Sequence, residues 1–295
     1  MTDAFSGYHP AVQFVYFVLV IGFSMCQMHP VCLLISLVCA LTYAIRLSGR
    51  RAVRFLLCGL LPLMLVTAAL NPVFNHEGAT ILAYFPNGNP LTREAILYGI
   101  AAACMMVTVI LWFSCYNKVM TSDKFLYLFG RVIPALSLIF SMTLRFVPRF
   151  TAQLRTVTAA QRGMGRGGSG SVVRRAKNGI AVLSAMITWA LENAVVTADS
   201  MKSRGYGLRG RTAFSLYRFS RRDAGLLLFF VLCAVLTAGS AALGGLSWRY
   251  YPMTGGVWKA PLSLTAFASY FALCLSPSAL DWREERKWNA LKSGM

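Results

Sequence analysis

Residues 11–47 read AVQFVYFVLVIGFSMCQMHPVCLLISLVCALTYAIRL, two long apolar runs separated only by His29 and Pro30. Each run is close to the ~20 residues that cross ~30 Å of hydrocarbon at ~1.5 Å per residue. Backbone polar groups find no water inside a bilayer, so a spanning run of this kind must be a helix. The stretch therefore predicts two membrane-spanning helices joined by a tight turn.

Four later segments have the same character, which gives six predicted spans at roughly 11–28, 31–47, 53–70, 96–115, 225–243 and 260–277. The whole chain of 295 residues is 57% hydrophobic and 13% charged. A soluble domain usually has roughly twice that charged fraction. The expected fold class is an all-α integral membrane protein with about six transmembrane helices and further helices on the cytoplasmic side.

The distribution of basic residues predicts the orientation of these spans. Four arginines lie in residues 46–54, between the second and third spans, whereas residues 71–95 contain one. Because basic loops stay on the cytoplasmic side, the first loop should face inward and the loop near 71–95 outward. Both termini are then expected inside.

Residues 131–148, RVIPALSLIFSMTLRFVP, could be read as a seventh span. Arginines 131 and 145 leave a short uncharged core, however, and a proline stands near each end. Crossing here would also put the basic residues that follow on the outer side. We therefore expect a helix that lies in, or dips into, the cytoplasmic leaflet.

The block from 145 to 222 carries fifteen of the 29 basic residues. Two helices are predicted in it, at about 146–162 and 179–204, with Asn178 as the cap of the second. Glu192 near the middle of the second helix indicates a position along the membrane surface. Three regions follow: N-terminal spans in 1–130, cytoplasmic-side helices in 131–222, and C-terminal spans with a cytoplasmic tail in 223–295.

Both predicted helices of this block end in arginine and glycine, within AAQRGMGRGG (159–168) and ADSMKSRGYGLRGR (198–211). Helix termination alone could explain a single end of this kind. Arg204 would complement the helix dipole and Gly205 would take the left-handed cap position, and the same holds for Arg162 and Gly163. Two such ends in one block also suit docking to two copies of an acidic partner, because a guanidinium pairs well with carboxylates.

Other chemistry finds little support. The run from Gly163 to Gly168 fits GxGxxG but follows a helix rather than a strand, and no GxxxxGK[ST] occurs, so neither a dinucleotide nor an ATP site is predicted. No residue set is placed for catalysis or for a metal, and no cofactor is expected. The eight cysteines are expected to be reduced packing residues. The net charge of +19 suits anionic membrane lipids better than nucleic acid, since aromatic residues are not interleaved with the basic ones.

At these motifs the chain resembles a known family. The sequence ADSMKSRGYG is similar to the second arginine box of the transmembrane T component (EcfT) of energy-coupling factor (ECF) type ABC transporters, the cobalt/nickel-type permease family. LRFVPRF followed by AQR is similar to the approach to the first box of that family. The HP pair at 29–30 and LNPVFNHEGATIL are similar to one subset of that family. The resemblance covers most of the chain.

The resemblance implies a non-enzymatic scaffold in the bacterial plasma membrane. Its partners would be two ABC-type ATPase subunits, docked on two coupling helices, and a small membrane S component that binds a vitamin, a metal ion or another micronutrient. Arg204, with Ser203 and Gly205, corresponds to the second box. The first box departs from the family pattern, so its contact could be Arg162 with Gly163, Arg166 after a shift, or Met164 through apolar packing.

Two alternatives remain open at this stage. The chain could be a permease subunit of a conventional ABC transporter that forms the substrate path itself, although its spans lack the polar groups of such a path. It could also be a membrane-bound enzyme, although no catalytic side chains are apparent. The sequence does not choose the transported substrate.

Overall fold

The computed structural model describes residues 3–84, 88–130, 134–166, 171–206, 208, 217–256 and 260–293. Among these residues, six helices are long and apolar enough to cross a membrane. This confirms an all-α integral membrane protein. The chain forms two compact units, one of residues 1–125 with 217–295 and one of residues 126–216.

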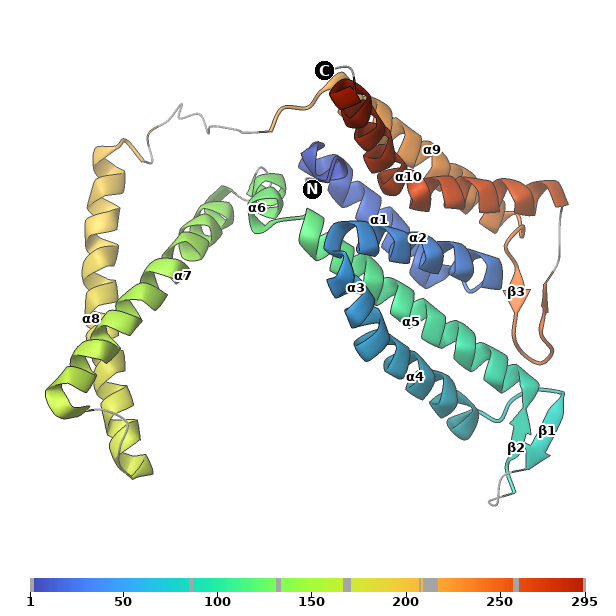
Figure 1. Ribbon diagram of the computed structural model, residues 1–295, viewed down its shortest axis with the longest axis horizontal. Coiled ribbons are helices and arrows are strands. Elements are labelled where there is room, and N and C mark those ends of the chain that lie inside the picture. The colour runs from blue at the N-terminus through green and yellow to red at the C-terminus, as the bar shows by residue number, and fades with distance from the viewer. Residues whose placement is uncertain are drawn as a thin grey trace. The chain divides into compact units, whose positions relative to one another are not determined.

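The first unit is a bundle in which each predicted span appears as a helix (Figure 1). The helices are α1 (Pro10–Cys26), α2 (Pro30–Ser48), α3 (Arg50–Phe55) continuing through the π-helical turn η2 (Leu56–Leu60) into α4 (Leu61–Phe74), α5 (Arg93–Val119), α9 (Arg221–Ala242) and α10 (Ala260–Ser293). The last helix passes through Pro277 without ending. The C-terminal tail is therefore a direct continuation of the sixth span.

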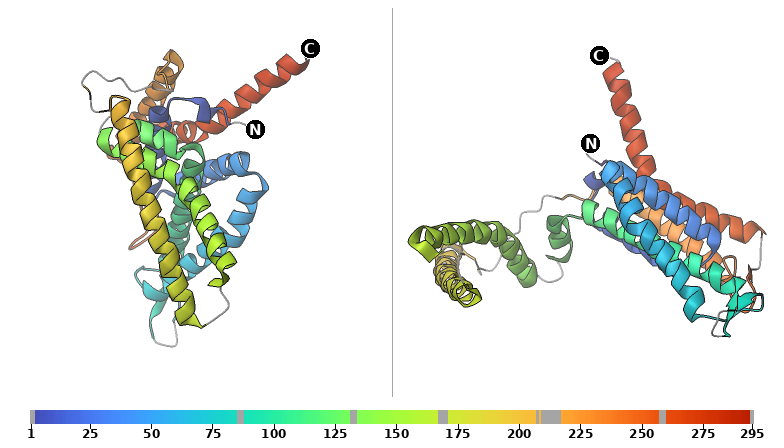
Figure 2. Two further views of the ribbon diagram at one scale, coloured as in Figure 1. Left: turned by 90° about the vertical axis from the view of Figure 1, so that its left-hand side faces the viewer. Right: turned by 60° about the horizontal axis from the view of Figure 1, so that its bottom comes forward.

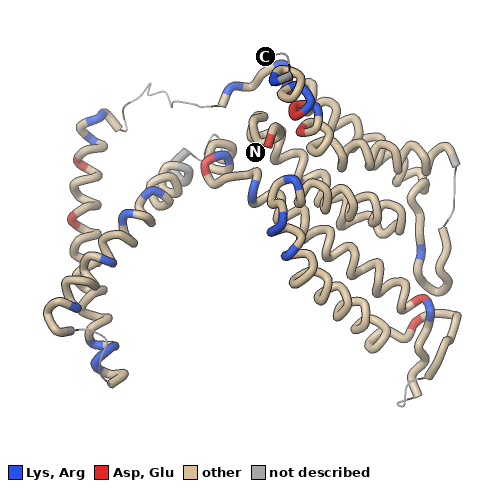
Figure 3. Tube along the Cα trace, in the orientation of Figure 1, with Lys and Arg blue, Asp and Glu red and all other residues tan. Residues whose placement is uncertain are grey.

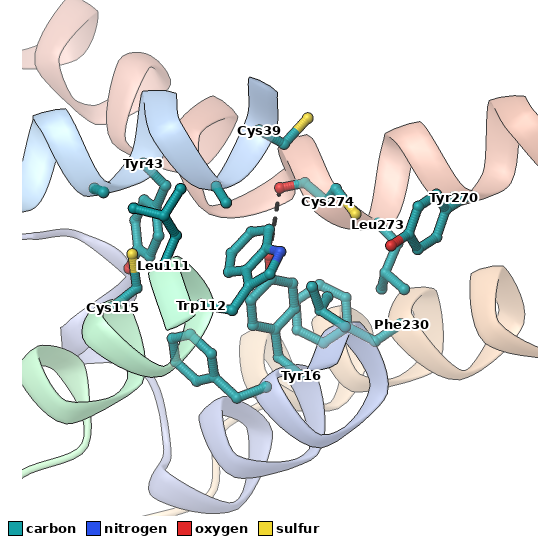
Figure 4. Packing of buried hydrophobic residues seen from close by; sticks show 14 of the residues in the cluster. Tyr16, Cys39, Tyr43, Leu111, Trp112, Cys115, Phe230, Tyr270, Leu273 and Cys274 are labelled. Carbon is teal, nitrogen blue, oxygen red and sulfur yellow. Dashed lines mark hydrogen bonds between the residues drawn. The ribbon is translucent and has the colours of Figure 1, made fainter. Parts of the chain in front are cut away.

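Large aromatic side chains fill the middle of this bundle (Figure 4). Tyr16, Trp112 and Tyr270 are at most 1% exposed. The Trp112 Nε1 donates to Ser36 Oγ at 2.9 Å, and Ser24 Oγ lies 2.8 Å from Ser36 Oγ and 3.1 Å from the Tyr270 hydroxyl. Because a polar group in an apolar interior needs a partner, this network links α1, α2, α5 and α10.

All eight cysteines are free thiols. Five are buried in the bundle, in line with a packing role, but Cys26 and Cys58 are exposed. The expectation that all eight are packing residues is therefore wrong for these two. Both lie on helices whose outer faces are apolar and are free to contact lipid.

The segment before α1 contacts the chain on both sides of the second unit, near Lys124, where the chain leaves the first unit, and near Asp223, where it returns. The Nζ of buried Lys124 donates to the Ser6 carbonyl at 2.8 Å, to Gln13 Oε1 at 3.1 Å and to the Val119 carbonyl at 3.0 Å. These bonds use all three donors of the ammonium group. On the returning side, Asp223 accepts from the backbone N–H of His9 at 3.0 Å. The N-terminal segment thus holds both connections.

The predicted outer loops contain short hairpins. Strand β1 (Ile81–Tyr84) pairs antiparallel with β2 (Pro90–Thr92), and β3 (Trp248–Arg249) pairs with β4 (Gly255–Gly256). Glu94, at the start of α5, fixes the first hairpin by accepting from the backbone N–H of Thr80 at 3.2 Å and from its hydroxyl at 2.5 Å.

The second unit consists mainly of α7 (Pro134–Gln161), the turn η3 (Arg162–Arg166) and α8 (Val172–Ser203), preceded by α6 (Ser122–Gly130), which begins in the first unit. The separate helices expected at 131–148 and 146–162 are one helix with Pro148 inside it, and residues 131–133 lie outside the described residues. Pro134 occupies the first position, where a proline needs no hydrogen bond.

The start of α8 also corrects a prediction. The helix begins at Val172 after Ser171, not after Asn178. Asn178 therefore lies in the helix interior, and residues 172–177, which read VVRRAK, form nearly two additional turns before it. The three basic side chains among them, all exposed, interrupt the apolar pattern from which the helix was predicted.

Candidate functional site

The helices α7 and α8 of the second unit cross one another (Figures 1 and 2). At the crossing, the ring of Phe150 meets that of Trp189 edge to face, with centroids 5.2 Å apart and planes at 81°. The Arg149 guanidinium carbon lies 5.6 Å from the centroid of the Trp189 ring. Among the described residues of α8, the side chain that is buried is that of Met186. Aromatic and cation–π contacts therefore fix the crossing.

The C-terminal tip of α8 is closed by a Schellman motif. The N–H of Tyr206 donates to the Met201 carbonyl and that of Gly205 to the Lys202 carbonyl, both at 3.0 Å. Gly205 has a φ of +74°, the left-handed conformation that such a closure requires. The predicted left-handed position of Gly205 is confirmed.

This closure presents Arg204 at the end of the helix. Arg204 is exposed and is the C-cap residue of α8. The preceding Ser203 donates its hydroxyl hydrogen to the Ser200 carbonyl at 2.9 Å. Within the described part of the chain, no carboxylate oxygen lies within 4.0 Å of the Arg204 guanidinium. The charge is therefore available to a partner.

The tip of α7 has a different geometry. The chain passes from Gln161 into the π-helical turn η3, and the left-handed residue is Gly165, with a φ of +77°. The prediction that Gly163 takes this position is wrong, because the wider turn continues the coil beyond Arg162 before it closes. Arg162 and Met164 are both exposed, so both are available for contact, whereas the side chain of Arg166 lies outside the described residues.

The two tips lie toward opposite ends of α8. Arg162 borders a groove of about 710 Å³ between α7 and α8, and Asn178 lies on the α8 side of the same groove. Arg204 follows Asn178 by 26 positions, which corresponds to about 39 Å of helix at ~1.5 Å per residue. One compact partner would not contact both tips through a single small surface.

One face of α8 is apolar and exposed. Leu183, Ile187, Leu191 and Val195 are 59%, 52%, 64% and 63% exposed, and their spacing of four places them along one side. The predicted apolar face is confirmed as a pattern. Its exposure in the isolated chain means that lipid or another protein must cover it.

The described residues contain no group of three or more His, Cys, Asp or Glu side chains that could hold a metal ion. Two of the histidines act instead as helix caps. The Nδ1 atoms of His9 and His29 accept from the backbone N–H groups of Ala11 and Val31, each at 3.2 Å. Burial lowers the pKa of both imidazoles, which favours the neutral form that can accept. Sequence analysis missed these caps, although a His-Pro pair before an apolar run was a usable signal.

A bundle of membrane-spanning helices together with a second unit of two crossing helices that end in arginine defines a class of multi-pass membrane protein. A family model described as cobalt transport protein CbiQ matches residues 8–214, which include most of the bundle and both arginine tips. The chain belongs to this family.

Individual relatives carry the name energy-coupling factor transporter transmembrane protein EcfT. The protein of Bacillus selenitireducens is 33% identical over 112 residues, which cover 37% of this chain and 42% of that protein. That of Ruminiclostridium cellulolyticum is 26% identical over 221 residues, covering 69% and 81%. That of Staphylococcus aureus is 24% identical over 196 residues, covering 62% and 73%. The stretch that is 33% identical thus spans less than half of the Bacillus selenitireducens protein.

Proposed function

We propose that this chain is the membrane scaffold of an ECF-type ATP-driven importer, in which α7 and α8 couple ATP hydrolysis by two ABC-type ATPase subunits to the movement of a substrate-binding S component. The observation that carries the proposal is the exposed Arg204, presented by a closed helix tip in a chain of the CbiQ family. The EcfT relatives support the same assignment.

Each tip would hold one ATPase subunit. At the second tip, Arg204 would enter an acidic groove, with Ser203 and Gly205 shaping the backbone. At the first tip we assign the contact to Arg162 with Gly163, and Arg166 belongs to the same turn. The spacing of about 39 Å along α8 supports two separate docking subunits.

The exposed apolar face of α8 would be covered by the S component, which is itself a membrane protein in the EcfT resemblance. A substrate path through the chain itself is disfavoured. The middle of the described bundle is occupied by side chains such as Tyr16, Trp112 and Tyr270, which are at most 1% exposed. The scaffold role therefore explains the packing better than that of a conventional permease subunit.

The same reasoning gives a non-catalytic subunit in the bacterial plasma membrane, with both termini and residues 145–222 on the cytoplasmic side. Basic residues concentrate in that block and at the junction of α2 and α3, as the positive-inside rule requires. The transported micronutrient, whether a vitamin or a metal ion such as cobalt, would be selected by the S component.

The test is purification of the tagged chain from its native membrane, with and without Arg204→Glu. Wild-type protein should retain two ATPase subunits and a small hydrophobic protein. The variant should stay in the membrane but lose ATPase, because a buried charge pair at an interface is worth about 2–5 kcal/mol when one partner is removed.

Arg155→Glu provides a matched control, since Arg155 is an exposed arginine within α7, seven positions before Arg162. It should leave the complex intact. Retention of the ATPase by the Arg204 variant at the wild-type level would remove the docking role, and a homodimer copurifying with a soluble receptor would favour the conventional permease.

A further inference from the structure

The corner between α2 and α3 carries a dense group of cations. Gly49, with a φ of +55°, turns the chain between the two helices, and Arg50, Arg51 and Arg54 follow on α3, all exposed. Figure 3 shows basic residues gathered where α2 meets α3 and where α5 ends nearby. Three cations within five positions repel one another unless an anion lies between them.

The described part of the chain does not neutralise this group. Arg46, on the last turn of α2, pairs with Glu285 at 3.6 Å. Across the described ranges, Arg50, Arg51 and Arg54 have no carboxylate oxygen within 4.0 Å. The nearby Lys118 donates to the Leu47 carbonyl and, at 3.0 Å, to Ser48 Oγ, so it stabilises the end of α2.

A cavity of about 190 Å³ lies directly beside these cations, between α2, α3 and α5. Its polar groups are Arg51, Ser48 and Ser114. The remaining wall is largely apolar and is formed by Ala44, Leu47, Ala52, Phe55, Leu111 and Cys115. A cation and two hydroxyl groups beside an apolar wall are complementary to an anion that carries hydrocarbon.

The outer surface next to the cavity is apolar as well. Val53, Phe55 and Leu57 are 38%, 44% and 56% exposed, at the start of a continuous helix that crosses the membrane. The volume of the cavity is about six times the ~30 Å³ that a water molecule occupies in the liquid. It can hold a phosphate with the adjoining glycerol carbons but not acyl chains, which would lie against the exposed apolar surface.

We propose that the α2–α3 corner is a binding site for one anionic glycerophospholipid of the adjacent leaflet. Arg51, Ser48 and Ser114 bind the phosphate, and Arg50 and Arg54 supply further positive charge. A zwitterionic lipid is a poorer ligand because its own ammonium group opposes the three cations. Free phosphate shares the polar contacts but makes no use of the apolar wall and surface.

The test uses the full-length chain, purified in mild detergent and delipidated, with palmitoyl-oleoyl phosphatidylglycerol as the probe. Binding is followed by native mass spectrometry in parallel with phosphatidylcholine. We expect saturable binding of one phosphatidylglycerol. A basic residue at an anionic surface contributes roughly five-fold in affinity, so Arg50→Gln/Arg51→Gln/Arg54→Gln should bind about a hundred-fold more weakly.

The matched control removes the same charge elsewhere. Arg283→Gln/Lys287→Gln/Lys292→Gln changes three exposed residues at the end of α10 and should bind phosphatidylglycerol nearly as well as wild type. Equal losses in the two triple variants would show diffuse electrostatics and overturn the site. Equal binding of phosphatidylcholine would overturn it as well.

A second pair of variants tests the cavity with all charges kept. Ser114→Phe fills the cavity and should weaken binding, whereas Asn117→Phe, also exposed on α5 but not part of the cavity wall, should not. Unchanged binding by Ser114→Phe would refute the proposed phosphate position. Inorganic phosphate and glycerol 3-phosphate are added as competitors, and displacement of the lipid by millimolar phosphate alone would assign the site to a free anion instead.

Discussion

Gly205 tests whether the closed tip of α8 is needed to present Arg204. Its φ of +74° is unfavourable for any residue with a Cβ atom, and that atom would lie 3.1 Å from Leu208 Cδ1. The left-handed conformation costs an L-residue roughly 1–2 kcal/mol, so Gly205→Ala should reduce the population of the closed tip by about five- to thirty-fold. Gly205→Asn should cost less, because asparagine tolerates this conformation better.

Two measurements follow the effect. Affinity for the copurifying ATPase should decrease in the order wild type, Asn, Ala, and trypsin should cleave after Arg204 faster in the same order. Gly179→Ala is the control, since a Cβ at Gly179, in the interior of α8, meets nothing within 4 Å and alanine favours a helix. Wild-type behaviour of Gly205→Ala in both assays, or an equal loss with Gly179→Ala, would refute the reasoning.

Three further predictions concern other parts of the chain. Burial lowers the pKa of His29 below that of a free histidine, so between these two pKa values the unfolded chain binds more protons than the folded protein. Acidification through that window should therefore reduce the free energy of unfolding by up to about 1 kcal/mol, which is what a helix cap contributes. His29→Asn, a cap that does not titrate, should flatten the dependence of Tm on pH. Lys124→Met leaves three acceptors without their donor and should cost about 1–3 kcal/mol, measured by denaturation in detergent, whereas Lys118→Met at an exposed site should cost less. Glu192→Cys, with the exposed native cysteines replaced by serine, should react with an impermeant maleimide in inside-out vesicles and not in intact cells.

The membrane helices could be predicted from the sequence because each apolar run is a local signal. The span expected at 31–47 is the helix Pro30–Ser48, and that expected at 225–243 is Arg221–Ala242. The ends differ where polar residues extend a helix beyond its apolar run. This is clearest in α10, whose charged last turns continue to Ser293.

Contacts between distant residues could not be predicted in this way. Lys124 looks like an ordinary surface lysine in the sequence, yet it is buried because the Ser6 carbonyl, 118 positions earlier, accepts from it. Its pKa is lowered by that burial and held up in part by the nearby Asp3. No periodicity or local motif encodes such a pairing, which depends on the fold of the whole bundle.

The two arginine tips differ in how well sequence predicts them. After Arg204, glycines stand at 205, 207 and 210, and the structure uses the first of them, Gly205, as the left-handed residue. After Arg162, glycines stand at 163, 165, 167 and 168, and each could close the helix. The structure uses Gly165, which a rule based on the first glycine does not select. This tip was mispredicted because the chain enters a π-helical turn at Arg162 before it closes, and no local motif indicated that turn.

Hydropathy and length alone do not identify the helices that cross the membrane. By those criteria α8 is long and apolar enough to span, while α1, with 17 residues, is too short. The packing nevertheless makes α1 a helix of the bundle, because Tyr16 and Phe17 of α1 belong to the buried core of the bundle. The 3-10 turn Phe5–Gly7 extends the buried segment of α1 toward the N-terminus. In contrast, α8 carries Glu192 within its apolar run, has charges at both ends, and packs on another amphipathic helix. A carboxylate near the middle of a spanning helix is costly, so we expect the lower free energy for α8 at the membrane surface, where its apolar face would meet lipid or a partner and its tip would stay in water.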